Sequence, residues 1–255
     1  MRLIDTHAHL DFDDYNQDRE EVFNRARKIG VDKIVNIGAD LEGSRRAVKL
    51  AEKYGDVYAS VGIHPHEADT VNEKSLAELK ILASSPKVKA IGECGLDFYY
   101  DNSPRKIQKE AFKKQLNLAL ELKLPVVIHS REAAAETLEI LDQTADFAQN
   151  LIFHCYAYGL EEIEEIIKRD YYVAFGGLIT FNSAQPIRDA LKKMPLNRIL
   201  LETDAPYLTP APHRGKRNEP AYLEHIVNKA AEIKQISAEK MGEITTENAE
   251  RIYNF

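Results

Sequence analysis

Short runs rich in β-branched and aromatic residues alternate with longer amphipathic stretches along nearly the whole chain. This alternation predicts a parallel sheet whose strands are joined by helices. The expected strands are 3–7, 32–37, 57–63, 88–93, 126–129, 151–154, 172–175 and 199–202. The expected helices are 16–29, 43–54, 73–83, 105–122, 131–142, 160–169, 183–193, 220–234 and 238–252. Together they make eight strand–helix repeats followed by one further helix.

Eight such repeats within 255 residues favour an α/β fold of the (β/α)8 type, the TIM barrel. A doubly wound open sheet is the alternative, but the Gly-rich phosphate loop that usually follows its first strand is missing. Ser237 begins the last helical pattern, which we interpret as an extra C-terminal helix that closes the barrel. Because no linker, low-complexity tract or internal repeat interrupts the pattern, the sequence predicts a single domain over residues 1–255.

The chain is acidic, with a formal net charge of −7, so no overall positive field attracts nucleic acid. A phosphate-bearing substrate would therefore need a metal or a local basic patch for its recognition. The two cysteines, Cys94 and Cys155, are too few for a disulfide framework and suit a reducing compartment. No apolar stretch is long enough to span a bilayer, and the N-terminus lacks the features of a signal peptide. We expect a cytoplasmic protein that needs neither a membrane nor an obligate protein partner.

The first apolar run, LIDTHAHL, ends in two histidines, His7 and His9. Residues two apart in a strand point to the same side, so both imidazoles project together from the end of this strand. Other side chains that can bind metals stand at the ends of later strands: His64, Glu93, His129, His154 and Asp204. Barrel enzymes build their active sites at the carboxyl ends of the strands. Five of the eight histidines are at this face, which indicates a site rather than packing.

These side chains are suited to divalent cations. Imidazoles and carboxylates in a desolvated barrel mouth are costly without partners, and a cation removes that cost by coordinating them. Four histidines and two carboxylates are more ligands than one tetrahedral site uses, so we expect a two-metal centre. The sequence predicts one ion on His7, His9 and Asp204 and the other on His129 and His154. Glu93 would bridge the two ions, because the fourth strand lies between the two groups around the barrel.

Two cations held about 3.5–4 Å apart stabilise the attacking and leaving oxygens of an in-line displacement and lower the pKa of a bound water towards 7. This arrangement suits phosphodiester hydrolysis by a metal-bound hydroxide. Asp204 could orient the attacking water and accept its proton. We give His64 a substrate role, in contact with the phosphate or the leaving group, rather than a ligand role. The expected catalytic residues are therefore Asp204, Glu93 and His64.

Several longer motifs identify a family. They are DTHAHLD near the start, GIHPHEA at 62–68, IGECGLDFYYDNSPRKIQKEAF at 91–112, LPVVIHSREA at 124–133 and LLETDAPYLTPAPHRGKRNEPAY at 200–222. Together they resemble the TatD-type metal-dependent deoxyribonucleases, a hydrolase branch of the amidohydrolase-like barrels. The resemblance implies DNA hydrolysis supported by Mg or Mn, often from the 3′ end, with Zn or Ni possible in the isolated protein. It implies these metal ligands: His7, His9, Glu93, His129, His154 and Asp204.

Basic and aromatic residues near the strand ends are the expected substrate contacts. The loop 209–220 follows the eighth strand and carries Arg214 and Lys216, where barrels often bind phosphate. Arg131, two residues after His129, could bind a phosphate through two hydrogen bonds. The aromatic run 98–100 could stack on a base, as in proteins that bind single strands. We therefore expect His64, Arg131, Arg214 and Lys216 to bind substrate.

Two other functions remain open at this point. Some relatives in the family resemble deacylases of mischarged tRNA, so a metal-dependent esterase acting on D-aminoacyl-tRNA or another carboxyl ester is the main alternative. Many dinuclear amidohydrolases bridge their metals with a modified lysine at the end of the fourth strand, whereas here that position is Glu93 and Lys89 is at the other end. A non-catalytic metal-stabilised scaffold is the third possibility, and the excess of ligands over a closed site argues against it.

The chain departs from the family's pattern after His154, where the usual Ser-Gly is replaced in HCYAYG. Any contact made by that serine is therefore missing.

Overall fold

The computed structural model describes residues 1–144 and 150–255, and its strands follow the expected pattern. In the sheet the strands stand in chain order, β1 to β8. They are β1 Leu3–Ala8, β2 Val31–Ile37, β3 Val57–Val61, β4 Val88–Asp97, β5 Val126–Arg131, β6 Leu151–Phe153, β7 Tyr172–Phe175 and β8 Ile199–Leu201. The expectation that the fourth strand ends at Glu93 is wrong, because β4 keeps pairing with β5 through Asp97, opposite Arg131.

The helices also agree with the sequence pattern, within about three residues at each end. They are α1 Arg19–Lys28, α2 Leu41–Lys53, α3 Glu73–Leu82, α4 Arg105–Leu122, α5 Ala134–Asp142, α6 Leu160–Lys168, α7 Gln185–Lys193, α8 Leu223–Lys234 and α9 Ala238–Tyr253. Side-chain caps fix several of their starts. Asp40 accepts a hydrogen bond from Gly43 N at 2.7 Å, and Ser237 accepts one from Lys240 N at 3.2 Å. The extra C-terminal helix is therefore α9, capped by Ser237 as expected.

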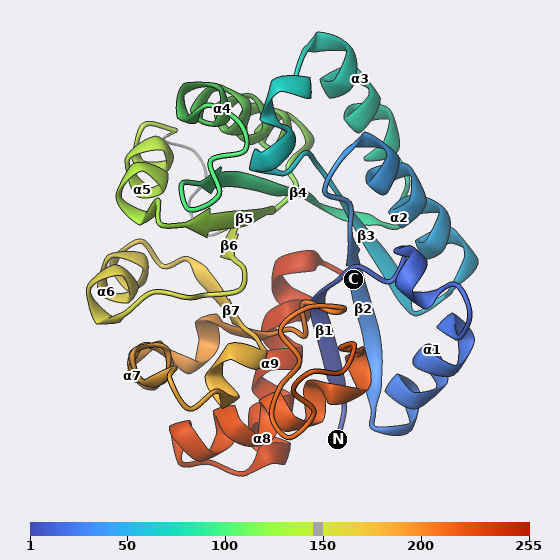
Figure 1. Cartoon of the computed structure of the whole chain (residues 1–255), viewed down its shortest axis with the longest axis vertical. Coiled ribbons are helices and arrows are strands. Elements are labelled where there is room, and N and C mark those ends of the chain that lie inside the picture. The colour runs from blue at the N-terminus through green and yellow to red at the C-terminus, as the bar shows by residue number, and fades with distance from the viewer. Residues whose placement is uncertain (145–149) are drawn as a thin grey trace. The chain divides into compact units, whose positions relative to one another are not determined.

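The chain divides into two compact units, and the first consists of Met1–Asn36 with Cys155–Phe255. In it β1 pairs with β2 and β7 with β8, both parallel. A bridge between Ala8 and Ala205 joins the end of β1 to the segment after β8. α9 packs against β1 and β8 (Figure 1), and the core between them is apolar and closed to solvent. This packing fixes the end of β1 beside the segment that follows β8.

The second unit, Ile37–His154, contains the parallel strands β3, β4, β5 and β6. α4 lies along β4 (Figure 1) and buries Phe112 and Leu116 against it. A Cβ on Gly62 would lie 2.6 Å from Gly92 Cα, so only glycine permits this approach of β4 to the segment after β3. Among the described residues, no helix is both long and apolar enough to cross a bilayer. The organisation as a single domain stays a prediction.

Candidate functional site

A first cluster of metal-binding side chains lies in the first unit, where β1 ends. His7 Nε2 lies 3.3 Å from His9 Nε2, and each of these atoms lies 3.7 Å from Asp204 Oδ1. All three side chains are buried. Backbone hydrogen bonds hold the two segments together, from Asp204 N to His7 O at 2.9 Å and from His9 N to Ala205 O at 2.7 Å. The three donor atoms therefore converge on one point.

The spacing of these donor atoms fits a divalent cation. A point equidistant from the three atoms in their own plane lies about 2.1 Å from each of them, the length of a Zn–N, Zn–O or Mg–O bond. Two neutral imidazoles and one carboxylate are also a donor set that Zn, Mn and Fe accept. The residues present therefore fit the metal that the sequence implied.

Asp5 supports this first cluster, and the sequence analysis missed it. Its Oδ1 accepts hydrogen bonds from Thr203 N at 2.9 Å and from His7 N at 3.3 Å, and its Oδ2 accepts one from Thr203 Oγ1 at 2.6 Å. Asp5 is fully buried, and burial raises its pKa to about 7. The carboxyl thus ties β1 to the residue before Asp204. Its position two residues before His7, on the same face of the strand, was the available signal.

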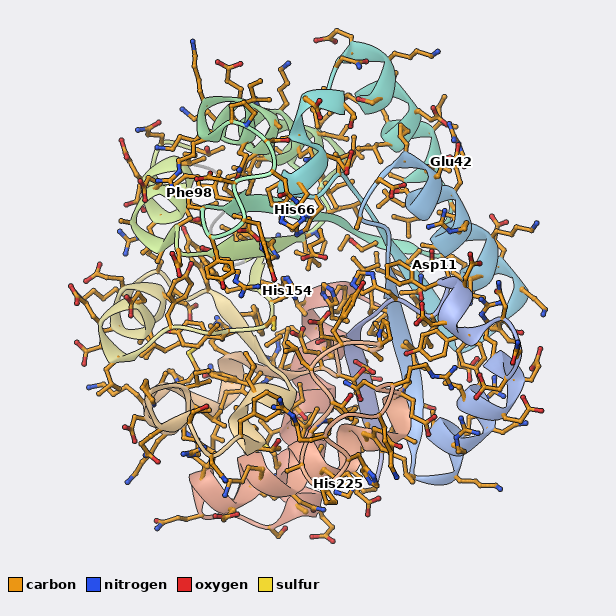
Figure 2. All side chains as sticks on the ribbon, viewed as in Figure 1. Asp11, Glu42, His66, Phe98, His154 and His225 are labelled. Carbon is orange, nitrogen blue, oxygen red and sulfur yellow. The ribbon has the colours of Figure 1, made fainter. Side chains whose placement is uncertain are left out.

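The second cluster lies in the second unit and centres on the buried carboxylate of Glu93. Glu93 Oε1 lies 2.8 Å from His129 Nδ1 and 2.8 Å from His154 Nε2, and these two nitrogens lie 3.3 Å apart. His64 Nε2 lies 3.4 Å from the same oxygen. His154, labelled in Figure 2, follows β6 directly. Separations near 3 Å are those of neighbouring ligands around a cation with bonds of about 2.1 Å, so this donor set also fits a metal.

Burial and neighbouring charges shift the pKa values of the side chains in the second cluster. Burial alone would raise the pKa of Glu93, but the imidazoles of His154, His64 and His129 hold it well below its usual value. For His129, burial opposes protonation, yet Asp97 and Glu93 outweigh it and raise the pKa. Burial, reinforced by His129, lowers the pKa of His64 to about 4, so this imidazole is neutral at neutral pH.

Asp97 and His66 belong to this second cluster, although the sequence analysis gave neither a role. Asp97 Oδ2 lies 3.1 Å from His129 Nε2 and 3.1 Å from His66 Nε2. A carboxylate on the far nitrogen of a metal-ligating histidine fixes its tautomer and orientation. Here it turns His129 Nδ1 towards Glu93 and His154. The expected end of the fourth strand at Glu93 hid this residue, since Asp97 shares the face of Glu93 only if the strand continues.

The expected substrate residues are divided between the two units, and the surroundings of each are described within its own unit. In the second unit, the Arg131 guanidinium lies 4.2 Å from the centre of the Tyr99 ring, and His64 lies beside Glu93. In the first unit, the Arg214 guanidinium lies 3.6 Å from the centre of the Phe181 ring. The carbonyl of Lys216 accepts a hydrogen bond from Thr209 Oγ1 at 2.6 Å, which closes the loop 209–220. Their contact with substrate stays a prediction.

Comparison with known proteins decides the family. The family model described as TatD related DNase matches residues 4–254. The chain belongs to this family. It is 43% identical over 251 residues to the uncharacterized metal-dependent hydrolase YabD of Bacillus subtilis, covering 98% of each chain. It is 38% identical over 257 residues to the 3′-5′ ssDNA/RNA exonuclease TatD of Cronobacter turicensis, covering 98% of this chain and 97% of that protein.

A solved structure supports the same assignment. The TatD homologue YjjV of Escherichia coli superposes with a TM-score of 0.94 at 31% identity, covering 100% of this chain and 98% of that one. The predicted (β/α)8 fold class is confirmed, as is the predicted membership of the TatD family. The chain is thus a metal-dependent hydrolase with nuclease relatives. The identity and number of its metals and the roles of the individual site residues stay predictions.

Proposed function

We propose that this chain is a divalent-metal-dependent deoxyribonuclease that removes nucleotides from the 3′ end of DNA. The observation that carries the proposal is the pair of clusters in which imidazole and carboxylate atoms converge at cation-ligand spacing. A relative described as a 3′-5′ ssDNA/RNA exonuclease, similar over 98% of this chain, supports the choice of substrate. A cytoplasmic location remains a prediction from the sequence.

We assign one cation to each cluster, with Mg or Mn as the working metal. The first would be held by His7, His9 and Asp204, and the second by Glu93, His129 and His154. Bound there, the cations would neutralise charge on the phosphate and lower the pKa of the attacking water. The chain supplies the rest: Asp204 orients the water and accepts its proton, while Asp97 keeps the ligand nitrogen of His129 directed at the site.

His64 contributes a fixed proton to this scheme. Its Nδ1 accepts a hydrogen bond from His66 N at 3.2 Å, so the neutral ring carries its proton on Nε2. The low pKa of His64 keeps the ring in this neutral form over the working pH range. Nε2–H therefore offers a donor beside Glu93, available to a phosphate oxygen or to the leaving group.

Metal replacement tests the proposed function directly. Protein stripped with a chelator should leave a 3′-labelled single-stranded DNA intact, and Mg or Mn should restore stepwise loss of nucleotides from the 3′ end. Zn and Ni serve as comparison metals, and D-aminoacyl-tRNA as a parallel substrate. Release of the amino acid with the DNA intact would contradict the proposal and favour the esterase alternative.

Replacing His64 tests its proposed role. His64→Ala should lower kcat on DNA about tenfold, because one hydrogen bond to a charged group is lost. Metal content should be unchanged, since Glu93, His129 and His154 remain. Mass spectrometric metal analysis alongside steady-state kinetics measures both quantities. Loss of a metal from this variant would instead make His64 a ligand.

A further inference from the structure

A basic and aromatic surface borders the second donor cluster. It combines two tyrosines after β4, an arginine at the end of β5 and three cations along α4. We call these residues the α4 surface: Tyr99, Tyr100, Arg105, Lys109, Lys113 and Arg131. All six lie in the second unit, so their arrangement is part of one compact body. Phe98, which two of the α4 cations contact, is labelled in Figure 2.

The two tyrosines of the α4 surface are exposed, whereas tyrosines with a packing role would be buried. Each is 54% exposed, and the two rings stand at 89° with their centres 4.9 Å apart. The Tyr100 ring also meets the His66 ring edge-on, at 5.5 Å between centres. A pair of rings that covered the end of the sheet would be largely inaccessible. Their exposure leaves flat aromatic surface open to a ligand.

Arg131 adds a cation to these rings. Its guanidinium lies 4.2 Å from the centre of the Tyr99 ring and 4.8 Å from that of Tyr100. Among the described residues, no carboxylate forms an ion pair with this side chain, which is exposed. Stacking on the rings therefore orients the guanidinium while its N–H groups remain available. That is the arrangement in which arginine recognises a phosphate.

Asp97 connects this surface to the proposed metal ligands. Its Oδ1 accepts hydrogen bonds from Tyr99 N at 3.1 Å and Tyr100 N at 2.9 Å, while its Oδ2 holds His129 Nε2. Phe98 N donates to Arg131 O at 2.9 Å, which fixes the arginine beside the same turn. One carboxylate thus orients both a metal ligand and the two tyrosines. A ligand stacked on the rings would be held at a fixed position relative to His129.

The cations of α4 extend the surface away from the rings. Arg105, Lys109 and Lys113 are spaced by four residues and so follow one face of the helix, at about 6 Å per step. Together with Lys106 and Glu110 they line a groove of about 370 Å³. Four cations and one carboxylate line it on a chain with a net charge of −7, although Arg105 also pairs with Asp101 at 2.8 Å and Lys109 lies 4.0 Å from Glu136. The groove is thus a local positive track on an acidic protein.

We propose that the α4 surface binds the single-stranded nucleic acid on the 5′ side of the cleaved nucleotide. A base stacks on the tyrosine pair, Arg131 binds a phosphate, and the phosphates further along the strand lie against the α4 cations. Aromatic rings beside a positive groove are how proteins hold single strands without reading their sequence. The direction of the strand rests on the proposed 3′-end activity, whereas binding itself does not.

Salt dependence of binding tests the α4 cations. The anisotropy of a fluorescein-labelled twelve-nucleotide oligo-dT, measured in EDTA, gives the affinity without cleavage. Each lost phosphate contact lowers the slope of log K against log salt by about 0.7, so Lys109→Gln with Lys113→Gln should lower it by about 1.4. The double variant Lys192→Gln with Lys193→Gln, on α7, removes the same charge and should keep the wild-type slope. Equal slopes in the wild type and the α4 variant would overturn the proposal.

Base stacking tests the tyrosines with an oligonucleotide that contains 2-aminopurine. Tyr99→Leu with Tyr100→Leu should weaken binding about tenfold and reduce quenching of the probe, whereas Tyr99→Phe with Tyr100→Phe keeps both rings and should bind as the wild type does. Leu and Phe variants with equal affinity would overturn the stacking role. Because binding is measured without metal, altered slopes in a protein that cleaves no DNA would retain the surface and reject the nuclease. Cleavage of DNA together with unaltered slopes would retain the nuclease and reject the α4 surface as its binding site.

Discussion

Glu93→Gln is expected to abolish metal-dependent hydrolysis and to reduce the metal content of the protein. The substitution keeps the size of the side chain but removes the only carboxylate whose oxygen lies 2.8 Å from both His129 and His154 among the described residues. A dication in the second cluster would then have only neutral partners, the imidazoles and the amide oxygen. Loss of an outer partner of a metal ligand alone typically costs 10- to 100-fold, so loss of this ligand should cost more than about 100-fold in activity.

The number of cations lost distinguishes two roles of Glu93. Mass spectrometric metal analysis after dialysis against Mn should show two ions lost if Glu93 bridges them, as the sequence analysis predicts, and one ion lost if it serves the second cluster alone. Glu139→Gln, an exposed carboxylate on α5, is the matched control and should keep wild-type metal content and activity. Full activity and two bound ions in Glu93→Gln would show that Glu93 is not a ligand.

The grouping of most site residues could be predicted because it depends on position along the chain. Parallel strands end at one edge of a sheet, so the end of each strand is enough to bring His129 near His154. The donor atoms of His7, His9 and Asp204 converge for the same reason. The alternation of strands and helices places each strand end within a few residues, which is enough for this grouping, although it ended the fourth strand at Glu93 where β4 runs to Asp97.

Asp97 could not be predicted because its role depends on register. In the sheet His129 stands opposite Gly95 and Arg131 opposite Asp97, which lets the Asp97 carboxylate reach the His129 ring from the neighbouring strand. Nothing in a single sequence gives that alignment.

The basic loop 209–220 shows the same limit. Arg217 pairs with Asp18, with Nη1 2.8 Å from Oδ1 and Nη2 2.6 Å from Oδ2, while Arg214 stacks on Phe181. The spacing of these arginines in the sequence does not show which one forms an ion pair and which one stacks on a ring.

Asp97→Asn is expected to weaken metal binding in the second cluster by 10- to 100-fold, the usual loss when the outer partner of a ligating histidine is changed. The Asn oxygen can still accept hydrogen bonds from Tyr99 N and Tyr100 N, so the turn after β4 should persist. The amide NH2, however, would face the N–H of His129 Nε2, and two donors cannot pair. His129 would relieve this conflict by moving its proton to Nδ1, the nitrogen that faces Glu93 and His154.

Metal titration separates this effect from a loss of folding. The Mn concentration for half-maximal activity should rise by the same 10- to 100-fold in Asp97→Asn, while activity at saturating Mn should largely recover, because the ligands themselves are intact. Asp101→Asn, in the same turn and paired only with Arg105 among the described residues, should leave the midpoint unchanged. An unchanged midpoint in Asp97→Asn would mean that His129 needs no carboxylate to orient it. Because the Asn oxygen still accepts hydrogen bonds from Tyr99 N and Tyr100 N, single-strand binding in EDTA should stay at the wild-type level, which confines the defect to the metal.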